Sequence, residues 1–436
     1  AGVSITNNGT ASGFGATGSA SWNTTVKTGD FTAVAGEGYF VNTTSGEIDV
    51  ALPAGTAGAV VAVKDYAGTF DTNNCILVPN GSDKIGGVAQ NATLSAEGLA
   101  VTLVFIDSTQ GWLVTDSGLQ DEAPGPQFIA ATGGTITTVC TNFKVHTFTG
   151  PGTFTVTNAG NSVGSNTVDY LVIAGGGAGG SDIAATAGGG GGAGGYRESG
   201  GTASGCYAVS PLGSSPSSVA ALPVTATAFP VVVGGGATAT PTSGACRNSP
   251  GSDSTFSTIT STGGGGGGNN PSGVSNPDRV AGAGGSGGGA PYYGPKVGGA
   301  GNTPPVSPPQ GRPGGDGAPG SPGYGSGAGG GATADGADGT PTAGGAGGAG
   351  ATSSINGTPT ARAGGGGGAA WTDAPPTSAG AGGSGGGGAG GADGGNPGNA
   401  GTTNTGGGGG GASGTPNPHL GGNGGSGIVI IRYKFQ

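Results

Sequence analysis

The feature that most limits how this chain can fold is a long block of glycine between two apolar segments. The protein has 436 residues, of which 112 are glycine, and most of the glycine lies between residues 171 and 427. Globular proteins contain roughly 7% glycine on average. Because glycine has no side chain, this block cannot build an ordinary hydrophobic core. The clearest uninterrupted runs are Gly188–Gly192, Gly263–Gly268, Gly364–Gly368, Gly385–Gly388 and Gly406–Gly411.

Three arrangements of such a block compete. Glycine and proline without a period are typical of a disordered chain. The stretch Gly311–Gly323 keeps glycine at every third position, as collagen does, but the strict period fails elsewhere. The third arrangement is a packed bundle of extended, left-handed helices with three residues per turn. We favour the packed bundle, and other loop-rich packing and a collagen-like assembly stay open as alternatives.

Energetics favour a bundle that forms as a whole. Ordering one residue costs about 1–2 kcal/mol, and glycine loses more freedom than most residues. A backbone hydrogen bond returns only about 0.5–1.5 kcal/mol. An isolated glycine helix is therefore unstable, whereas helices with several hydrogen-bonded neighbours and pinned ends can be stable. The apolar segments Val168–Ile173 and Ile428–Tyr433 lie on either side of the block, and we expect them to form strands that fix the ends of the helices.

The region from residue 21 to 117 predicts an all-β sandwich. Short β-branched or aromatic segments alternate with turn signals, and no segment has a helical period. The expected strands are Phe31–Val34, Gly38–Asn42, Ile48–Leu52, Val60–Asp65, Cys75–Val78, Ala92–Leu94, Val101–Ile106 and Trp112–Thr115. The expected core residues are Phe31, Tyr39, Val41, Ile48, Leu52, Val61, Val63, Leu103, Phe105, Trp112 and Val114.

The remaining chain divides by composition. Residues 1–20 are predicted to be an N-terminal arm, 118–126 a linker, 127–173 a β-strand base, 174–427 the glycine-rich domain and 428–436 a closing strand. Two further strand-like segments, Pro230–Val233 and Ser254–Ile259, are expected to join Val168–Ile173 and the closing strand in one sheet. The glycine helices would project from that sheet.

If successive helices run up and down, the inserts between them divide between two ends. The end far from the sheet is expected to hold 269–279, 303–310, 333–342, 371–377 and 413–420. The near end is expected to hold 290–297, 352–362 and 393–405.

Composition argues against several classes of partner. Charged residues make up 8% of the chain, the formal net charge is −10, and the 12 basic residues form no cluster. Nucleic-acid binding is therefore not expected. No apolar run approaches the ~20 residues that span a bilayer, so membrane insertion is not expected either. The first residues lack the pattern of a signal peptide, which suggests a removed signal, or release by assembly or lysis.

The four cysteines do not form a metal motif. None of them stands in a Cys-x-x-Cys pair, and only His146 and His419 could join them, so no zinc site is expected. Cys206 and Cys246 lie in one insert region and could form a disulfide. Buried thiols are expected for Cys75 and Cys140.

No catalytic constellation stands out. His146 lies in a strand-like segment, and surface or satisfied histidines are common there. The acidic loops around Asp335, Asp338 and Asp393 lack the spacing of known calcium sites. We therefore expect neither an enzyme nor a cofactor.

The inserts carry the residues suited to recognition. Exposed aromatic side chains on short, proline-containing loops lose little entropy on binding and anchor glycans or proteins well. They could instead cap the glycine bundle and shield its ends from water. The candidate receptor contacts are Trp371, Asp373, His419, Asn269, Arg279, Tyr292 and Tyr293.

Three segments carry a family resemblance. The opening Val168–Gly177, the motif Gly191–Arg197 and the closing Gly427–Tyr433 resemble the glycine-rich domain of phage tail-fibre and adhesin proteins, over about 270 residues. The segments Asp30–Phe40 and Gly111–Asp116 resemble β-domains in structural proteins of marine tailed phages. The same glycine-rich domain also occurs in cellular surface proteins.

The resemblance implies an all-β fold plus a polyglycine II helix bundle. It also implies a virion protein whose distal loops contact a bacterial surface receptor, protein or glycan, without catalysis. The N-terminal β-domain would bind other virion proteins and form a homo-oligomer, with a trimer favoured. The alternative is a subunit of a self-assembling extracellular filament or cell-surface structure.

Overall fold

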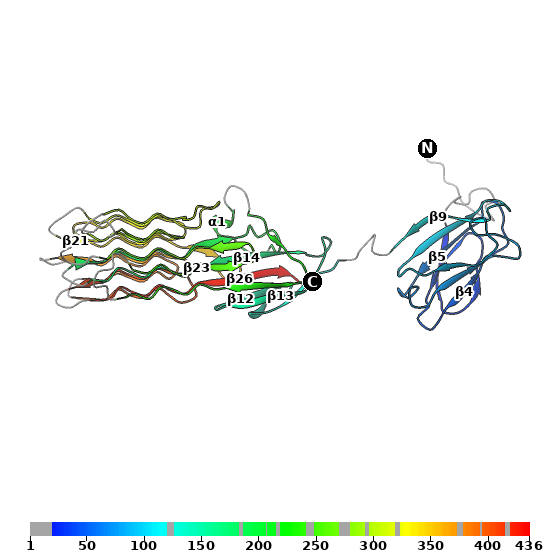
Figure 1. The fold of residues 1–436 in the computed structure, drawn as a ribbon, viewed down its shortest axis with the longest axis horizontal. Helices are drawn as coiled ribbons and strands as arrows, with labels where there is room; N and C mark the ends of the chain where they lie inside the picture. Colours follow the sequence, from blue (N-terminus) through cyan, green and yellow to red (C-terminus); the bar gives the residue numbers. More distant parts are fainter. Residues whose placement is uncertain are drawn as a thin grey trace, which may run out of the picture. The chain divides into compact units, whose positions relative to one another are not determined.

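In a computed structural model, the chain divides into two compact units, Ala1–Gly125 and Pro126–Gln436 (Figure 1). The residues that the structure describes are 20–119, 126–182, 186–205, 207–214, 219–240, 248–269, 280–292, 296–318, 323–372, 378–392, 395–414 and 419–436. Almost all of the predicted arm and most of the predicted linker fall outside these ranges.

The first unit is a sandwich of two sheets around a side-chain core. Their strand orders are β1-β3-β5-β8-β9 and β2-β4-β6-β7. The strands are β1 Ser21–Lys27, β2 Phe31–Thr32, β3 Glu37–Val41, β4 Ile48–Ala51, β5 Val60–Asp65, β6 Cys75–Val78, β7 Ala92–Leu94, β8 Ala100–Phe105 and β9 Trp112–Gly118. The predicted core is buried there, except that Phe31 is half-buried and Val114 is 54% exposed. Val114 lies on β9, the edge strand of its sheet, just before the register shift between Thr102 and Leu103.

Strand β1 is the element of this unit that the sequence analysis missed. It pairs in parallel with β3, and Trp22 lies opposite Gly38. A Cβ added at Gly38 would lie 2.9 Å from the Trp22 ring, so the glycine makes room for the indole. The strand was missed because its polar Asn23, Thr24 and Thr25 show no apolar alternation.

The second unit begins with two facing sheets, which we call the base. One has the order β10-β13-β18-β19-β20, and the other β11-β12-β26-β14-β16, with β17 beside β14. The strands are β10 Ile129–Thr132, β11 Thr135–Val139, β12 Phe143–Phe148, β13 Gly152–Ala159, β14 Thr167–Ile173, β16 Tyr196–Glu198, β17 Leu222–Pro223, β18 Ala228–Val232, β19 Ser254–Phe256, β20 Ile259–Ser261 and β26 Ile428–Lys434.

The prediction of one common sheet was wrong. Strands β18 and β19 belong to the sheet that faces β14 and β26. Phe256 and Val231 pack against Val172 and Tyr433 in the core between the two sheets. The apolar runs of β14 and β26 are buried on both faces, because their other face, with Leu171 among its residues, packs toward the glycine block.

From the base, glycine-rich segments run side by side toward the end that holds β21 (Gly323–Gly325) (Figure 1). We call each segment a rod, and the end away from the base the far end. Hydrogen bonds repeat every three residues along a rod. In rod 174–180, residues 175 and 178 donate to rod 249–252, 176 and 179 to rod 422–425, and 177 and 180 to rod 189–192. Rod 174–180 thus has neighbours in three directions, as expected for a helix with three residues per turn.

The rods pack through backbone, and this explains their glycine. A Cβ added at Gly177 would lie 2.2 Å from the carbonyl oxygen of Gly265, and one at Gly190 would lie 2.1 Å from that of Gly366. No side chain fits at such positions. The packed bundle is therefore confirmed for the described rods, and the collagen-like stretch 311–318 lies among them as a single rod that bonds Gly331, Gly299 and Ala328.

Several inserts lie at the end opposite to the predicted one. Residues 303–310 lie near the base, where the Gln310 carbonyl accepts the N–H of Tyr196. Residues 290–292 lie at the far end instead. The reason is a reversal at Gly284–Ser286, inside a glycine run. Before it the chain is antiparallel to rod 263–268, and after it the chain is parallel to that rod.

Two predicted inserts contain rods. Gly336 and Gly339 donate to the rod at 311–318, within the region expected to be a far loop. Asn399 and Thr402 likewise donate to rod 385–391, within a region expected to be a near loop. The near-end prediction for 352–362 agrees with the structure, which has a hairpin there of β22 (Ala351–Ser353) and β23 (Thr360–Arg362), with Ile355 in a cluster with base residues.

Candidate functional site

The far end carries three aromatic side chains on neighbouring rods. Gly327 donates its N–H to the carbonyl of Ala290, and Ser326 donates to that of Ala369, both at 2.9 Å. The three rods are therefore adjacent. Each one reaches the far end with a ring, from Tyr292, Tyr324 and Trp371, and we call these three residues the aromatic ladder.

The ladder is a stack held by backbone pairing. The Tyr292 and Tyr324 ring centroids are 4.8 Å apart at 36°, and those of Tyr324 and Trp371 are 5.2 Å apart at 16°. Tyr324 and Trp371 are opposite each other in the antiparallel pair of β21 and β24 (Ala370–Thr372). All three residues are half-buried. The ladder thus caps the rods and also keeps aromatic surface exposed.

Hydroxyl groups lie beside the ladder. The N–H of Gly325, next to Tyr324, donates to the carbonyl of Thr340 at 3.1 Å. Thr342 and Ser378 lie near this contact, because Thr342 precedes Ala343, and Ala343 forms an isolated β-bridge with Ser378. All three hydroxyl residues are exposed. The Thr340 hydroxyl also accepts the N–H of Ala343 at 2.9 Å, which fixes this turn.

A second far-end group is internal. Asn269 is 1% exposed, and its Oδ1 accepts the N–H of Ser181 at 2.8 Å and the amide of Asn248 at 3.3 Å. Its predicted role as a receptor contact is therefore wrong, because the side chain satisfies backbone inside the rod ends. His419 pairs with Asp182 through backbone hydrogen bonds in both directions and is half-buried.

The predicted candidates thus separate into three groups. Trp371 and His419 lie at the far end, as expected. Tyr292, expected near the base, joins Trp371 there through Tyr324, which the sequence analysis did not single out. Asp373, Arg279, Tyr293, Cys206 and Cys246 lie outside the described residues.

The other cysteine and histidine residues that the sequence analysis considered are either buried in a core or exposed on the surface. Cys75 is buried, and burial raises the pKa of its thiol to about 12. Cys140 is exposed, so the prediction of a buried thiol there was wrong. His146 is buried, with Nδ1 2.7 Å from the carbonyl of Gly133 and Nε2 3.1 Å from the hydroxyl of Tyr433.

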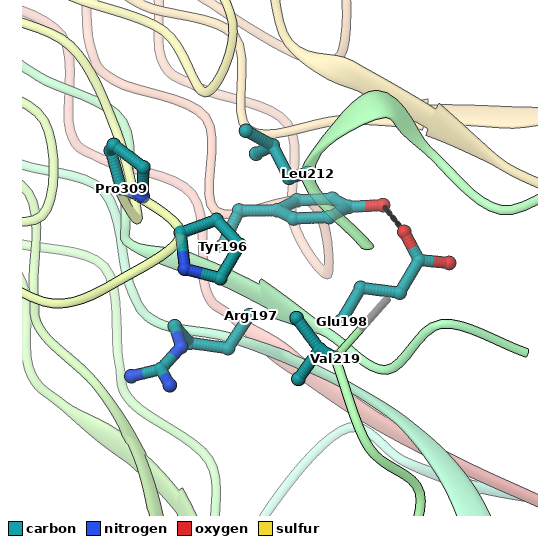
Figure 2. Close-up of a pocket in the computed structure, with 7 residues that line it drawn as sticks. Tyr196, Arg197, Glu198, Leu212, Val219 and Pro309 are labelled. Atoms are coloured by element: carbon teal, nitrogen blue, oxygen red, sulfur yellow. Dashed lines mark hydrogen bonds between the residues drawn. The ribbon is translucent and has the colours of Figure 1, made fainter. Parts of the chain in front are cut away.

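A surface depression near the base leads to a buried polar cluster (Figure 2). The Tyr196 hydroxyl points to Glu198 and donates to its carboxylate at 3.0 Å. That carboxylate also accepts the N–H of Ser210, at 3.1 Å, and the hydroxyl of Ser353. Burial raises the pKa of Glu198. The cluster ties β16 to the segment before α1 (Pro211–Ser214) and to β22, so it has a bracing role.

The described residues contain no group of three or more His, Cys, Asp or Glu side chains that could hold a metal ion. Within the same ranges, no helix has the length and apolar character needed to cross a bilayer. The far end offers aromatic rings and exposed hydroxyls, which are groups suited to binding.

Comparison with known protein families gives a match over the second unit. Residues 147–434 match the sequence model of a family described as a glycine-rich domain. The match runs from the end of β12 through all the rods to the last residue of β26, so it includes the ladder and the base strands that follow β12, but not β10, β11 or the first part of β12. A search of curated proteins finds no match.

Proposed function

The chain belongs to the glycine-rich domain family, and from this premise we propose that it is a non-enzymatic fibre or adhesin protein of a bacteriophage particle. Its far end would contact the surface of a host bacterium. The observation that carries the proposal is the aromatic ladder. Three large aromatic rings pack against one another and are partly exposed at the far end of rods that otherwise pack mainly through their backbone.

The lattice suits a rigid support. The inner rod 174–180 is hydrogen-bonded to neighbours in three directions, and it continues directly from β14 of the buried base. The ladder is therefore ordered before any partner arrives, which lowers the entropy lost on binding. The motifs at 168–177, 191–197 and 427–433, which resemble those of phage adhesins, support the assignment to a virion.

The first unit would then serve attachment. We propose that it joins the protein to other virion proteins and to further copies of itself, as a trimer. The location would be the extracellular virion, and a cell surface is the alternative. Binding of nucleic acid and insertion into a membrane form no part of this proposal.

Gold-labelled antibodies against the first unit provide a test by electron microscopy. We expect label at the tail or fibres of phage particles, and purified protein should block adsorption of those particles to their host. Continuous label along an open helical polymer would contradict the proposal and favour a filament subunit, because an open helix is the symmetry of a filament.

A further inference from the structure

We propose that the aromatic ladder binds carbohydrate, and that the sugar rings of a neutral surface glycan lie against Tyr292, Tyr324 and Trp371. This inference rests on the proposed function, because it takes the far end as the contact surface. It adds the chemical class of the ligand. Protein receptors are the competing class, and the experiments below separate the two.

The ladder has the geometry of a prepared platform. Tyr324 and Trp371 are nearly parallel at 16°, and their 5.2 Å centroid separation is that of an offset stack. Both residues are half-buried, so part of each aromatic side chain is exposed to solvent. Backbone pairing of Gly323 with Thr372 and of Gly325 with Ala370 fixes both strands. Few rotamers would therefore be lost on binding.

A sugar ring matches this surface chemically. Its faces present C–H groups, which pack against aromatic rings and make weak contacts with their π-systems. Its rim presents hydroxyls, which need donors and acceptors. The ladder supplies tyrosine hydroxyls, and the exposed Thr342 and Ser378 lie beside it. The three adjacent rings offer a joint apolar surface to a chain of sugars.

Charge favours a neutral ligand. The formal net charge of −10 opposes the approach of polyanions. Lys296, on the rod that follows Tyr292, donates its ammonium to the carbonyl of Ala318 at 2.7 Å. This lysine side chain is thus held by the rods rather than extended toward a ligand. The chemistry that remains is that of a neutral polyol with apolar ring faces.

Saturation-transfer NMR with defined probes provides the test. The full chain is mixed with cellohexaose, maltohexaose, chitohexaose or mannohexaose, and with acyclic sorbitol. We expect at least one hexasaccharide to bind with a dissociation constant on the order of 1 mM or tighter, whereas sorbitol does not bind. Absence of binding by every hexasaccharide would overturn the proposal.

Variants locate the binding. Trp371→Ala and Tyr324→Ala should weaken binding at least tenfold, whereas Trp371→Phe and Tyr324→Phe should largely retain it. Tyr66→Ala is the matched control, since Tyr66 is a 58% exposed aromatic residue of the first unit. Circular dichroism checks that each variant is folded. Binding that stays unchanged in both folded alanine variants would place the sugar elsewhere and contradict the proposal.

Treatment of host cells separates this proposal from the one it rests on. Adsorption of the protein should be lost after periodate oxidation of surface glycans and retained after protease treatment. Loss after protease alone would overturn the carbohydrate inference but leave the adhesin function intact. Absence of adsorption to untreated host cells would contradict the adhesin function, while the NMR experiment still decides whether the ladder binds sugar.

Discussion

The two units exclude water from their interiors in different ways, one with side chains and the other with backbone. The first unit buries side chains, and its core contains Trp112, Phe70 and Leu103 between two sheets. The rods of the second unit bury backbone against backbone, and the carbonyl of one rod fills the space where another rod would place a Cβ. In the first unit a missing side chain leaves a cavity, whereas in the rods an added side chain has no space.

Glycine accordingly does two different tasks. In the first unit many glycines have a positive φ, as at Gly111, where φ is +72°, and a few, such as Gly38, make room for a side chain. Along rod 174–180 no glycine has a positive φ, because a left-handed threefold helix needs only a negative φ near −75°. Glycine is needed there because it lacks a Cβ. The comparison therefore predicts that an added side chain destabilises the rods, whereas a truncated side chain destabilises the first unit.

The largest expected effect is that of Gly266→Val. A Cβ at this position would lie 1.8 Å from the carbonyl oxygen of Asn248, on a rod that is hydrogen-bonded to rods 174–180 and 263–268. We expect a loss of more than about 4 kcal/mol, enough to prevent folding of the second unit. Hydrogen exchange measured by mass spectrometry should show rapid exchange along the rods and normal protection in the first unit.

Two glycines with open space provide the controls for that experiment. Gly235, near the base, and Gly29, in the first unit, have nothing within 4 Å of an added Cβ, and neither has a positive φ. Alanine at either position should change the free energy of unfolding by less than about 0.5 kcal/mol. Tolerance of Gly266→Val at the level of these controls would contradict backbone packing.

The mirror experiment is Leu103→Ala in the first unit. Leu103 is fully buried, so truncation should cost about 2–5 kcal/mol through lost transfer energy and the cavity that remains. Denaturation followed by the fluorescence of Trp22 and Trp112 should shift, whereas hydrogen exchange along the rods should not. A parallel loss of protection in the rods would show that the two units do not unfold independently.

The sequence predicted the type of secondary structure in each unit better than the order in which the rods and inserts are connected. Turn signals and β-branched segments are local, so most strands of the first unit are within one or two residues of their predicted bounds. The rods followed from glycine content and hydrogen-bond energetics. The reversal at Gly284–Ser286 could not be predicted, because glycine runs carry no side chains to mark where a rod ends.

The ladder was predictable only in part for the same reason. Trp371 and Tyr292 stand out because they are aromatic residues in proline-containing inserts. Tyr324 stands between two glycines and gives no separate signal, and its place opposite Trp371 depends on pairing across many residues. Asn269 looked like a loop residue, because the buried partners Ser181 and Asn248 come from distant rods.

A smaller effect is expected where the rods do contain a polar side chain. Ser326 is fully buried, and its hydroxyl donates to the carbonyl of Ala187 at 2.7 Å. Ser326→Ala should cost about 1–2 kcal/mol, because that carbonyl loses a donor inside the lattice. The exposed Ser378→Ala is the control, with no measurable change expected in thermal unfolding. An equal effect of both variants would show that hydroxyls inside the rods add no stability.

The smallest effect should be a pH dependence of the base. Burial favours the neutral form of His146, in which Nδ1 donates to the carbonyl of Gly133 and Nε2 accepts the Tyr433 hydroxyl. Burial lowers its pKa below the ordinary value of about 6.5. The unfolded chain therefore binds the proton more readily, so stability is complete above pH 6.5 and falls as the pH decreases toward the lowered pKa.

The measurement is urea denaturation of the second unit between pH 8 and pH 5, above the range in which most carboxylates titrate. His146→Gln should be less stable at pH 8, because glutamine cannot reproduce both ring contacts, but it should lack the histidine-dependent decrease below pH 6.5. His419→Gln, at the far end, should keep that decrease. A decrease that survives in His146→Gln and disappears in His419→Gln would instead place the titrating group at the far end. The stability of the unit at low pH would then depend on the backbone packing of the rod ends and not on the core of the base.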